Sequence, residues 1–258
     1  MKPFIQLFSL LIAFIVTIPV FGYNESDLVK FKALNACQGC DLSEANLRNA
    51  NLTGANLSGV NLSNANFSRA NLRYANLTGA NLSGANFTGA DLSRVDIGGA
   101  SFSRANLSGA NFTGADLSRV NLSRINLSRA NFSYADLSRV SLSGTDLTGA
   151  NLTGANLTGA NLTGASLRDA NLSGTDLRTT NLYEADLLDA NLTKTNLRNA
   201  NFNNAYVNFT RTNFTEADLR DANLNGIDLT TSKLNNARLD GAKYCKTQMP
   251  WGLLNDDC

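Results

Sequence analysis

The chain has no histidine at all and very little proline. Only three of its 258 residues are Pro, and none of them lies between Phe21 and Met249. Without histidine the chain lacks the most common general base of enzymes, which argues against most acid–base and nucleophilic catalysis. Without proline in its long middle, every main-chain N–H there can donate a hydrogen bond, as a β-sheet requires.

What the chain has instead is a period of five residues. Leu or Phe stands at every fifth position from Leu42 to Phe202, with Ile97 as the single departure. Ala or another small or β-branched residue stands two places before each of them, and Asn, Asp or Ser stands one place before. The spacing widens to seven once, between Phe202 and Phe209, and the array then resumes as far as Tyr244. Such self-similarity predicts a repeat fold.

A period of five fits neither a helix nor a straight strand. On a helix each step of five turns the side chain by roughly 140°, and on a strand it alternates between the two faces. The chain must therefore turn once in every repeat, with Ala and Leu pointing inward and their polar neighbours outward. Most of the 20 Gly stand at the fifth position, which is expected if many corners need a positive φ.

The repeat itself, as in Ala150-Asn151-Leu152-Thr153-Gly154, resembles the pentapeptide-repeat proteins. This resemblance implies an all-β fold, the right-handed quadrilateral β-helix, in which four repeats close each coil. The array would then form a rod of about ten coils, spaced by roughly 4.8 Å. In such a rod Phe67 lies under Phe87, and Phe112 lies under Phe132.

We expect four segments along the chain. They are a signal peptide over residues 1–22, an N-terminal cap helix with a CxxC over 23–41, the β-solenoid over 42–244 and a C-terminal cap over 245–258. The first segment has one Lys, a long apolar run and small residues before a plausible cleavage site, as signal peptides do. The alternative is an uncleaved membrane anchor, because the run is near the lower length limit for a membrane span.

The two caps would cover the open ends of the rod, which otherwise expose core and unpaired strand edges. Before the array, Asn24 is a candidate N-cap, and Leu28, Phe31 and Leu34 lie on one helical face. After the array come four apolar candidates for the other end: Met249, Trp251, Leu253 and Leu254.

The four cysteines lie outside the predicted solenoid, two on each side: Cys37, Cys40, Cys245 and Cys258. A disulfide needs Cα atoms within about 7 Å, and the ends of the rod lie much farther apart. We therefore expect two local disulfides, although a CxxC can also be redox active or bind a metal. The Cys-Gln-Gly-Cys-Asp-Leu start and the YCKTQMPWG ending are similar to exported pentapeptide-repeat proteins of the cyanobacterial periplasm and of the thylakoid lumen, which implies the same localisation here.

An arginine band is the one surface feature that stands out from the repeat. It consists of Arg94, Arg104, Arg119, Arg124, Arg129 and Arg139. In the four-sided frame Asp96, Asp116 and Asp136 stack on the side that carries Arg119 and Arg139. One interpretation is a surface charge ladder in which each Asp lies near an Arg. The other is a docking band for an acidic protein or an anionic lipid.

We expect no catalytic, cofactor or metal site, because a narrow core filled by Leu and Phe leaves no ligand-sized pocket. The many Asn-Leu-Ser/Thr triplets match a glycosylation sequon, but the repeat generates them, and we expect solvated surface and side-chain ladders between coils. The leading hypothesis is a non-enzymatic exported scaffold or protein-interaction rod. Its partner would be another protein and not nucleic acid, with membrane contact only through the signal peptide.

Two alternative functions are weaker. Some pentapeptide-repeat proteins mimic DNA and bind a topoisomerase, but this requires a strongly acidic surface and a cytosolic location. Here 22 Lys and Arg balance 21 Asp and Glu. An ice-binding solenoid would need a flat column of Thr, whereas Thr148, Thr153, Thr158 and Thr163 fall on four different sides.

Overall fold

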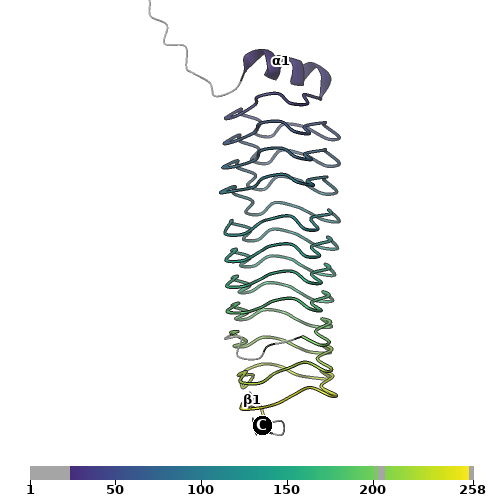
Figure 1. Cartoon of the computed structure of the whole chain (residues 1–258), viewed down its shortest axis with the longest axis vertical. Helices are drawn as coiled ribbons and strands as arrows, with labels where there is room; N and C mark the ends of the chain where they lie inside the picture. Colours follow the sequence, from purple (N-terminus) through teal and green to yellow (C-terminus); the bar gives the residue numbers. More distant parts are fainter. Residues whose placement is uncertain (1–23, 201, 203–206, 256–258) are drawn as a thin grey trace, which may run out of the picture.

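The computed structural model describes residues 24–200, 202 and 207–255. The predicted signal peptide and Cys258 lie outside these residues. Figure 1 shows a straight rod of stacked coils, with helix α1 (Glu25–Leu34) across one end and strand β1 (Thr247–Met249) at the other. β1 pairs with β2 (Gly252–Leu254) in an antiparallel hairpin. In this part of the chain no helix has the length and apolar character needed to cross a membrane.

Between these elements the chain forms a β-helix with 20 residues in each coil. Parallel bridges join residues 20 apart, such as Asn111 with Asn131 and Asn131 with Asn151. At each bridge the main chain makes hydrogen bonds along the rod, as from the Phe112 N–H to the Asn131 carbonyl, at 2.7 Å. The predicted all-β solenoid with four repeats per coil is therefore confirmed.

A β-turn closes every repeat. The Ala55 N–H donates to the Leu52 carbonyl at 3.0 Å, and between them Gly54 has a φ of 66°. Positive φ at the third residue is what a type II turn requires. Non-glycine residues adopt the same conformation at this position, as Asn64 does with a φ of 57°. The corner conformation thus belongs to the repeat, whichever residue occupies it.

The core is a column of Leu and Phe side chains with Ala beside them, nearly all of it buried. The predicted phenylalanine stacks are confirmed: the ring centroids of Phe67 and Phe87 lie 4.7 Å apart, and those of Phe112 and Phe132 lie 5.1 Å apart. Where Thr replaces Ala, its hydroxyl donates to a Leu carbonyl of the preceding coil, as Thr145 does to Leu122 at 2.8 Å. Hydrogen bonding is what makes a buried hydroxyl tolerable there.

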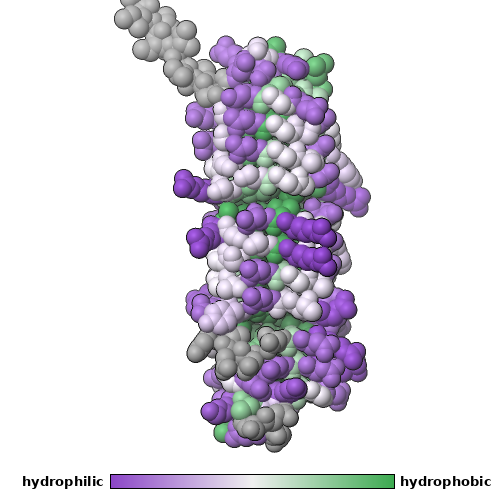
Figure 2. All heavy atoms as spheres, in the orientation of Figure 1, coloured by the Kyte–Doolittle hydropathy of each residue, from purple (hydrophilic) through white to green (hydrophobic). Residues whose placement is uncertain are grey.

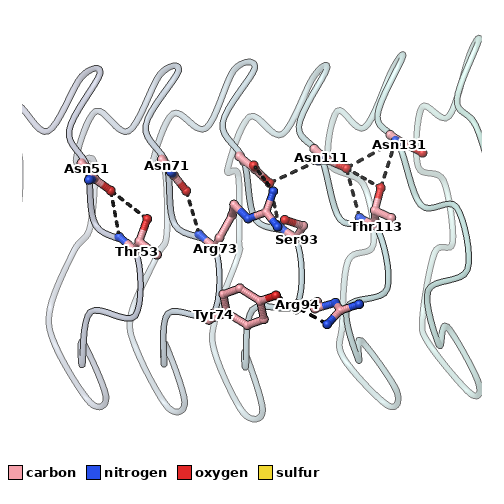
Figure 3. Close-up of polar contacts among 11 residues, drawn as sticks. Asn51, Thr53, Asn71, Arg73, Tyr74, Ser93, Arg94, Asn111, Thr113 and Asn131 are labelled. Atoms are coloured by element: carbon pink, nitrogen blue, oxygen red, sulfur yellow. Dashed lines mark hydrogen bonds and ion pairs between the residues drawn. The ribbon is translucent and has the colours of Figure 1, made fainter.

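The outward Asn side chains form ladders between coils, as Figure 3 shows. Asn111 Oδ1 accepts the Thr113 N–H at 3.1 Å, which fixes the start of the turn. The same oxygen accepts from Asn131 Nδ2 at 3.3 Å, and Asn131 Oδ1 accepts from Asn151 Nδ2 at 3.1 Å. Asn and Asp suit this position because a short side chain can bond the main chain two residues on.

The change of phase near Phe202 is absorbed within one coil. Bridges there join residues 22 apart, as from Asp186 to Asn208, and the spacing returns to 20 at Asn213 and Lys233. Val207 and Phe209 are both buried on the far side of the change. Two extra residues are therefore accommodated without exchanging inward and outward positions.

Helix α1 covers the first coil, as predicted. The Asn24 side chain accepts the Ser26 N–H at 3.0 Å and so caps the helix. Phe31 is buried and Leu28 partly buried against the core, but Leu34 is 64% exposed, so its predicted place on the covering face is wrong. Its neighbour Asn35 has left-handed backbone and ends the helix, which leaves Leu34 on the outer side.

The solenoid is longer than residues 42–244 at both ends. Ala36 already bridges Asn56, so residues 36–40 form a first repeat. At the other end Gln248 bridges Asp228, and Met249 is buried in the position of a repeat Leu.

The tail beyond Met249 covers less of the end than predicted. Leu254 is partly buried, but Trp251 and Leu253 are 60% and 51% exposed, which corrects their expected place over the core. The antiparallel hairpin directs them away from the last coil.

Candidate functional site

All six members of the arginine band stand at corners of the coil with left-handed backbone, as at Arg104 and Arg119, where φ is 61°. The 20-residue register places Arg104 with Arg124 on one corner and Arg119 with Arg139 on the adjacent corner. These four flank one face of the rod. Arg94 and Arg129 stand on the two remaining corners, so the band encircles the rod rather than forming a single patch.

None of these six guanidinium groups forms an ion pair within the described part of the chain. The carboxylates of Asp96, Asp116 and Asp136 do stack, but each accepts a main-chain N–H two residues on, as Asp116 does from Ser118 at 2.9 Å. The predicted charge ladder is therefore not formed.

The residues that stack on the same corner explain why the band arginines form no ion pairs. The Cγ atoms of Arg124 and Arg139 lie 3.4 Å from where a Cβ would stand on Gly144 and Gly159, one coil on. No carboxylate occupies a corner directly above or below a band arginine. Arg94, Arg124, Arg129 and Arg139 therefore lean over a glycine one coil on, and all six band side chains are exposed to solvent.

Arginines nearer the C-terminus behave differently. Arg211 pairs with Asp189, which stands on the same corner of the preceding coil, at 2.5 Å. Arg220 and Asp218 pair within one repeat, and the hydrogen bond from Arg220 lowers the pKa of Asp218 to about 2. Five Arg in this region pair with Asp: Arg168, Arg178, Arg198, Arg211 and Arg220.

Arg94 is the one band member with an aromatic partner. Its guanidinium carbon lies 5.8 Å from the ring centre of Tyr74, and Nη1 lies 3.5 Å from the Tyr74 hydroxyl (Figure 3). Arg73 approaches the same ring at 5.8 Å. Cation–π contacts of this kind are worth about 0.5–1 kcal/mol at exposed sites.

The face between the two arginine pairs is interrupted by a slot between coils, lined by Ala100, Ser101, Phe102, Ser103, Asn121, Ser123 and Ile125. Its volume is about 320 Å³. Among the described residues no bridge joins Ser101 to Asn121, and the N–H groups of Phe102, Arg104 and Asn121 make no main-chain hydrogen bond across the slot. One coil further on, Leu122 and Arg124 donate normally to Ser141 and Ser143.

Bulky inward residues explain the slot. Val120 and Ile125 occupy positions that hold Ala in most repeats, and they flank Leu122 directly beyond the Phe102 ring. Extra methyl groups in a close-packed core force the surrounding backbone to move. Figure 2 shows apolar atoms between coils in the middle of the rod, beside strongly hydrophilic side chains that project outward.

A second, shallower hollow of about 780 Å³ lies on the next face. Arg119 and Arg139 line one side of it, and Arg178, held by Asp176 at 2.7 Å, lines the far end. The hollow is open and polar, and it brings no nucleophile and general base together. The arginines that line it offer hydrogen-bond donors to anionic groups.

Cys37 and Cys40 form a disulfide, with Cα atoms 5.4 Å apart. The pairing of Cys245 with Cys258 involves a residue outside the described part of the chain and stays a prediction.

Sequence reasoning missed the slot, although Val120 and Ile125 in place of Ala signal it. It also missed that the band arginines are unpaired, which the glycines 20 residues away indicate.

The model described as pentapeptide repeats matches residues 36–69, 65–104, 85–124, 105–144, 125–164 and 145–182, and the model described as pentapeptide repeat region matches 165–244. No curated protein matches the chain.

Among solved structures, HetL, a pentapeptide repeat protein involved in heterocyst differentiation regulation in the cyanobacterium Nostoc, is 32% identical over 88% of this chain and 97% of its own, with a TM-score of 0.32. A pentapeptide repeat protein of the Arabidopsis thaliana thylakoid lumen is 27% identical over 47% of this chain and 66% of its own, with a TM-score of 0.14. QnrB1, a plasmid-mediated fluoroquinolone resistance protein, is 21% identical over 80% and 89%, with a TM-score of 0.38. Because the family models match most of its length, the chain belongs to the pentapeptide repeat family.

Proposed function

We propose that this protein is a non-enzymatic interaction rod that docks an acidic partner protein on its arginine band. The observation that carries the proposal is the set of six exposed guanidinium groups with no carboxylate partner among the described residues. Arginine recognises carboxylates in a bidentate manner and is enriched at interfaces. An unpaired arginine also loses no internal ion pair when a partner binds.

The primary contact would be the face bounded by Arg104 and Arg124 on one corner and Arg119 and Arg139 on the other. Between residues 92 and 140 these and two further Arg stand against only Asp96, Asp116 and Asp136. The local positive charge would steer an acidic partner towards the middle of an otherwise neutral molecule. The same basic surface disfavours DNA mimicry, which needs the opposite sign.

We further propose that the rod acts in an exported compartment, either the periplasm or the thylakoid lumen. The apolar N-terminal segment and the disulfide between Cys37 and Cys40 support this, because disulfides persist in oxidising compartments. N-terminal sequencing of the native protein should give a start near Tyr23. A mature chain that retains Met1 would contradict cleavage.

The test of docking uses immobilised poly-L-glutamate as the acidic probe. A variant with Ala at Arg104, Arg119, Arg124 and Arg139 should bind about tenfold or more weakly at low salt, because each exposed charge contributes roughly 0.3–1 kcal/mol. The matched control replaces four paired arginines outside the hollow, Arg168, Arg198, Arg211 and Arg220, and should lose less affinity. Equal losses in both variants would mean that only net charge matters and would sink the proposal.

The second arm uses vesicles that contain anionic phospholipid. Sedimentation of the rod with such vesicles at physiological salt, together with weak binding to poly-L-glutamate, would favour the lipid and contradict a protein partner. The partner itself can then be captured from the exported fraction by cross-linking, with the four-arginine variant as the negative control.

A further inference from the structure

The disulfide occupies a special place in the repeat. Cys37 stands where later repeats have Leu, and Cys40 stands where they have Ala, so both sulfurs point into the rod. The Cys40 N–H donates to the Cys37 carbonyl at 3.1 Å, and Gly39 has a φ of 68°, close to that of Gly54 in a later repeat. The ordinary turn of the repeat therefore brings the two side chains side by side on the same side of the chain.

A third metal-ligating group reaches the same point from helix α1. A carboxylate oxygen of Asp27 and the Sγ atoms of Cys37 and Cys40 all lie within 4.8 Å of one another. Both cysteines are buried and Asp27 is half-buried, beneath the helix that closes the rod. Asp27 Oδ2 accepts the Asp41 N–H at 3.0 Å, so the first repeat orients the carboxylate. Outer-shell hydrogen bonds of this kind are typical of ligating carboxylates.

We propose that, when the disulfide is reduced, these three side chains bind a zinc ion. Two thiolates and a carboxylate are ligands that zinc accepts, and a water molecule would complete the tetrahedron. The edges of such a tetrahedron are about 3.5–3.8 Å long, given metal–ligand bonds of about 2.0–2.3 Å. Because the three ligand atoms already lie within 4.8 Å of one another, small movements would bring them to these distances. None of them needs to come from a distant part of the chain.

Reduction of the disulfide and binding of zinc are two successive steps. A dithiol reductant attacks the disulfide, the Sγ–Sγ bond breaks, and the reductant leaves as its own disulfide after passing two electrons and two protons to the cysteine pair. Zinc then displaces both thiol protons to solvent and takes the Asp27 carboxylate as its third ligand. Under oxidising conditions the disulfide links only the two cysteines within the first repeat, whereas under reducing conditions the metal would fasten helix α1 to that repeat through Asp27.

Cobalt binding to the full-length chain tests this proposal. Ser replaces Cys245 and Cys258 so that the CxxC pair supplies the only thiols, and the chain is reduced and desalted without oxygen. One equivalent of Co²⁺ should then produce thiolate-to-cobalt charge-transfer bands and the visible bands of a tetrahedral site, and Zn²⁺ should remove both. The oxidised chain should give neither signal.

Two matched carboxylate variants locate the third ligand. Asp27→Asn should weaken cobalt binding at least tenfold, whereas Asp41→Asn, which keeps the main-chain N–H, should leave it unchanged. Circular dichroism and amide exchange in the middle coils confirm that each variant is folded. Absence of the charge-transfer bands in the reduced chain, or equal binding by both variants, would overturn the proposal.

Discussion

The middle and the C-terminal coils carry arginine at similar density but use it in opposite ways. Arg211 and Arg220 pair with Asp189 and Asp218, both at 2.5 Å, whereas Arg124 and Arg139 lie over glycine corners and face solvent. Arg211 and Arg139 both stand at a corner and have the same left-handed backbone conformation. What differs is the residue one coil away. At a corner, the pairing of an arginine is therefore decided about 20 residues along the chain, whereas Arg220, one position before a corner, pairs with Asp218 two residues away.

The two regions also differ in how completely their coils are joined. The slot leaves the Phe102 and Asn121 N–H groups without main-chain partners, while Phe214 and Leu219 donate along the rod at 2.7 and 2.8 Å. The region with unpaired charge is thus also the region with an open coil boundary. The middle coils are therefore where main-chain N–H groups and arginine side chains lack partners within the described residues.

The largest expected contrast is in amide hydrogen exchange. The N–H groups of Phe102, Arg104 and Asn121 should exchange about 10–100 times faster than those of Phe214 and Leu219, because each missing hydrogen bond is worth roughly 1–3 kcal/mol when its groups are buried. Native-state exchange followed by mass spectrometry measures this.

The control for the hydrogen-exchange measurement is a variant without the bulky residues beside the slot. Replacing Val120 and Ile125 with Ala, the usual residue at these positions, should let the coils approach and slow exchange at Phe102. Fast exchange that persists in the double variant would show that the bulky residues do not hold the slot open.

A smaller effect is expected from glycine at the corners. Arg139→Gly should raise the free energy of unfolding by about 1 kcal/mol, because Gly adopts positive φ without the steric cost that other residues have. Arg178→Gly is the matched control. Arg178 does not have left-handed backbone, and its replacement also removes the ion pair with Asp176. It should lower stability by about 1 kcal/mol. Urea denaturation of both variants decides between these signs.

The smallest effect concerns pH. Arg220 holds the pKa of Asp218 at about 2, below its ordinary value of 3.8. Because the folded pKa is the lower one, the ion pair stabilises the fold above about pH 4, and this contribution is lost as the pH falls through 2. Between pH 5 and pH 2 the free energy of unfolding of Asp218→Asn should therefore fall by about 0.5 kcal/mol less than that of the wild type. Arg220→Gln should flatten the urea-denaturation profile in the same way, and unchanged profiles in both variants would contradict this role.

The sequence predicted the solenoid well because its period leaves few geometric solutions. A turn in every five residues predicts the burial of Leu, but the four-sided coil that stacks Phe67 on Phe87 was implied only by the resemblance to the pentapeptide-repeat proteins. The ends were predicted less well, since Leu34 and Trp251 lie outside the repeat, where only local chain reversal decides which way a side chain points. The slot depends on small differences in volume between Ala and Ile125, which a pattern of apolar positions does not register.

The slot has a mechanical consequence. A rod held at both ends and pulled along its axis carries the load across every coil boundary in turn, so it parts where the fewest bonds cross. The coil boundary between Phe102 and Asn121 lacks main-chain hydrogen bonds that the next coil boundary has, so it is a weak point of the rod. Under tension the coils should separate there first, leaving two shorter rods joined by the continuous polypeptide chain.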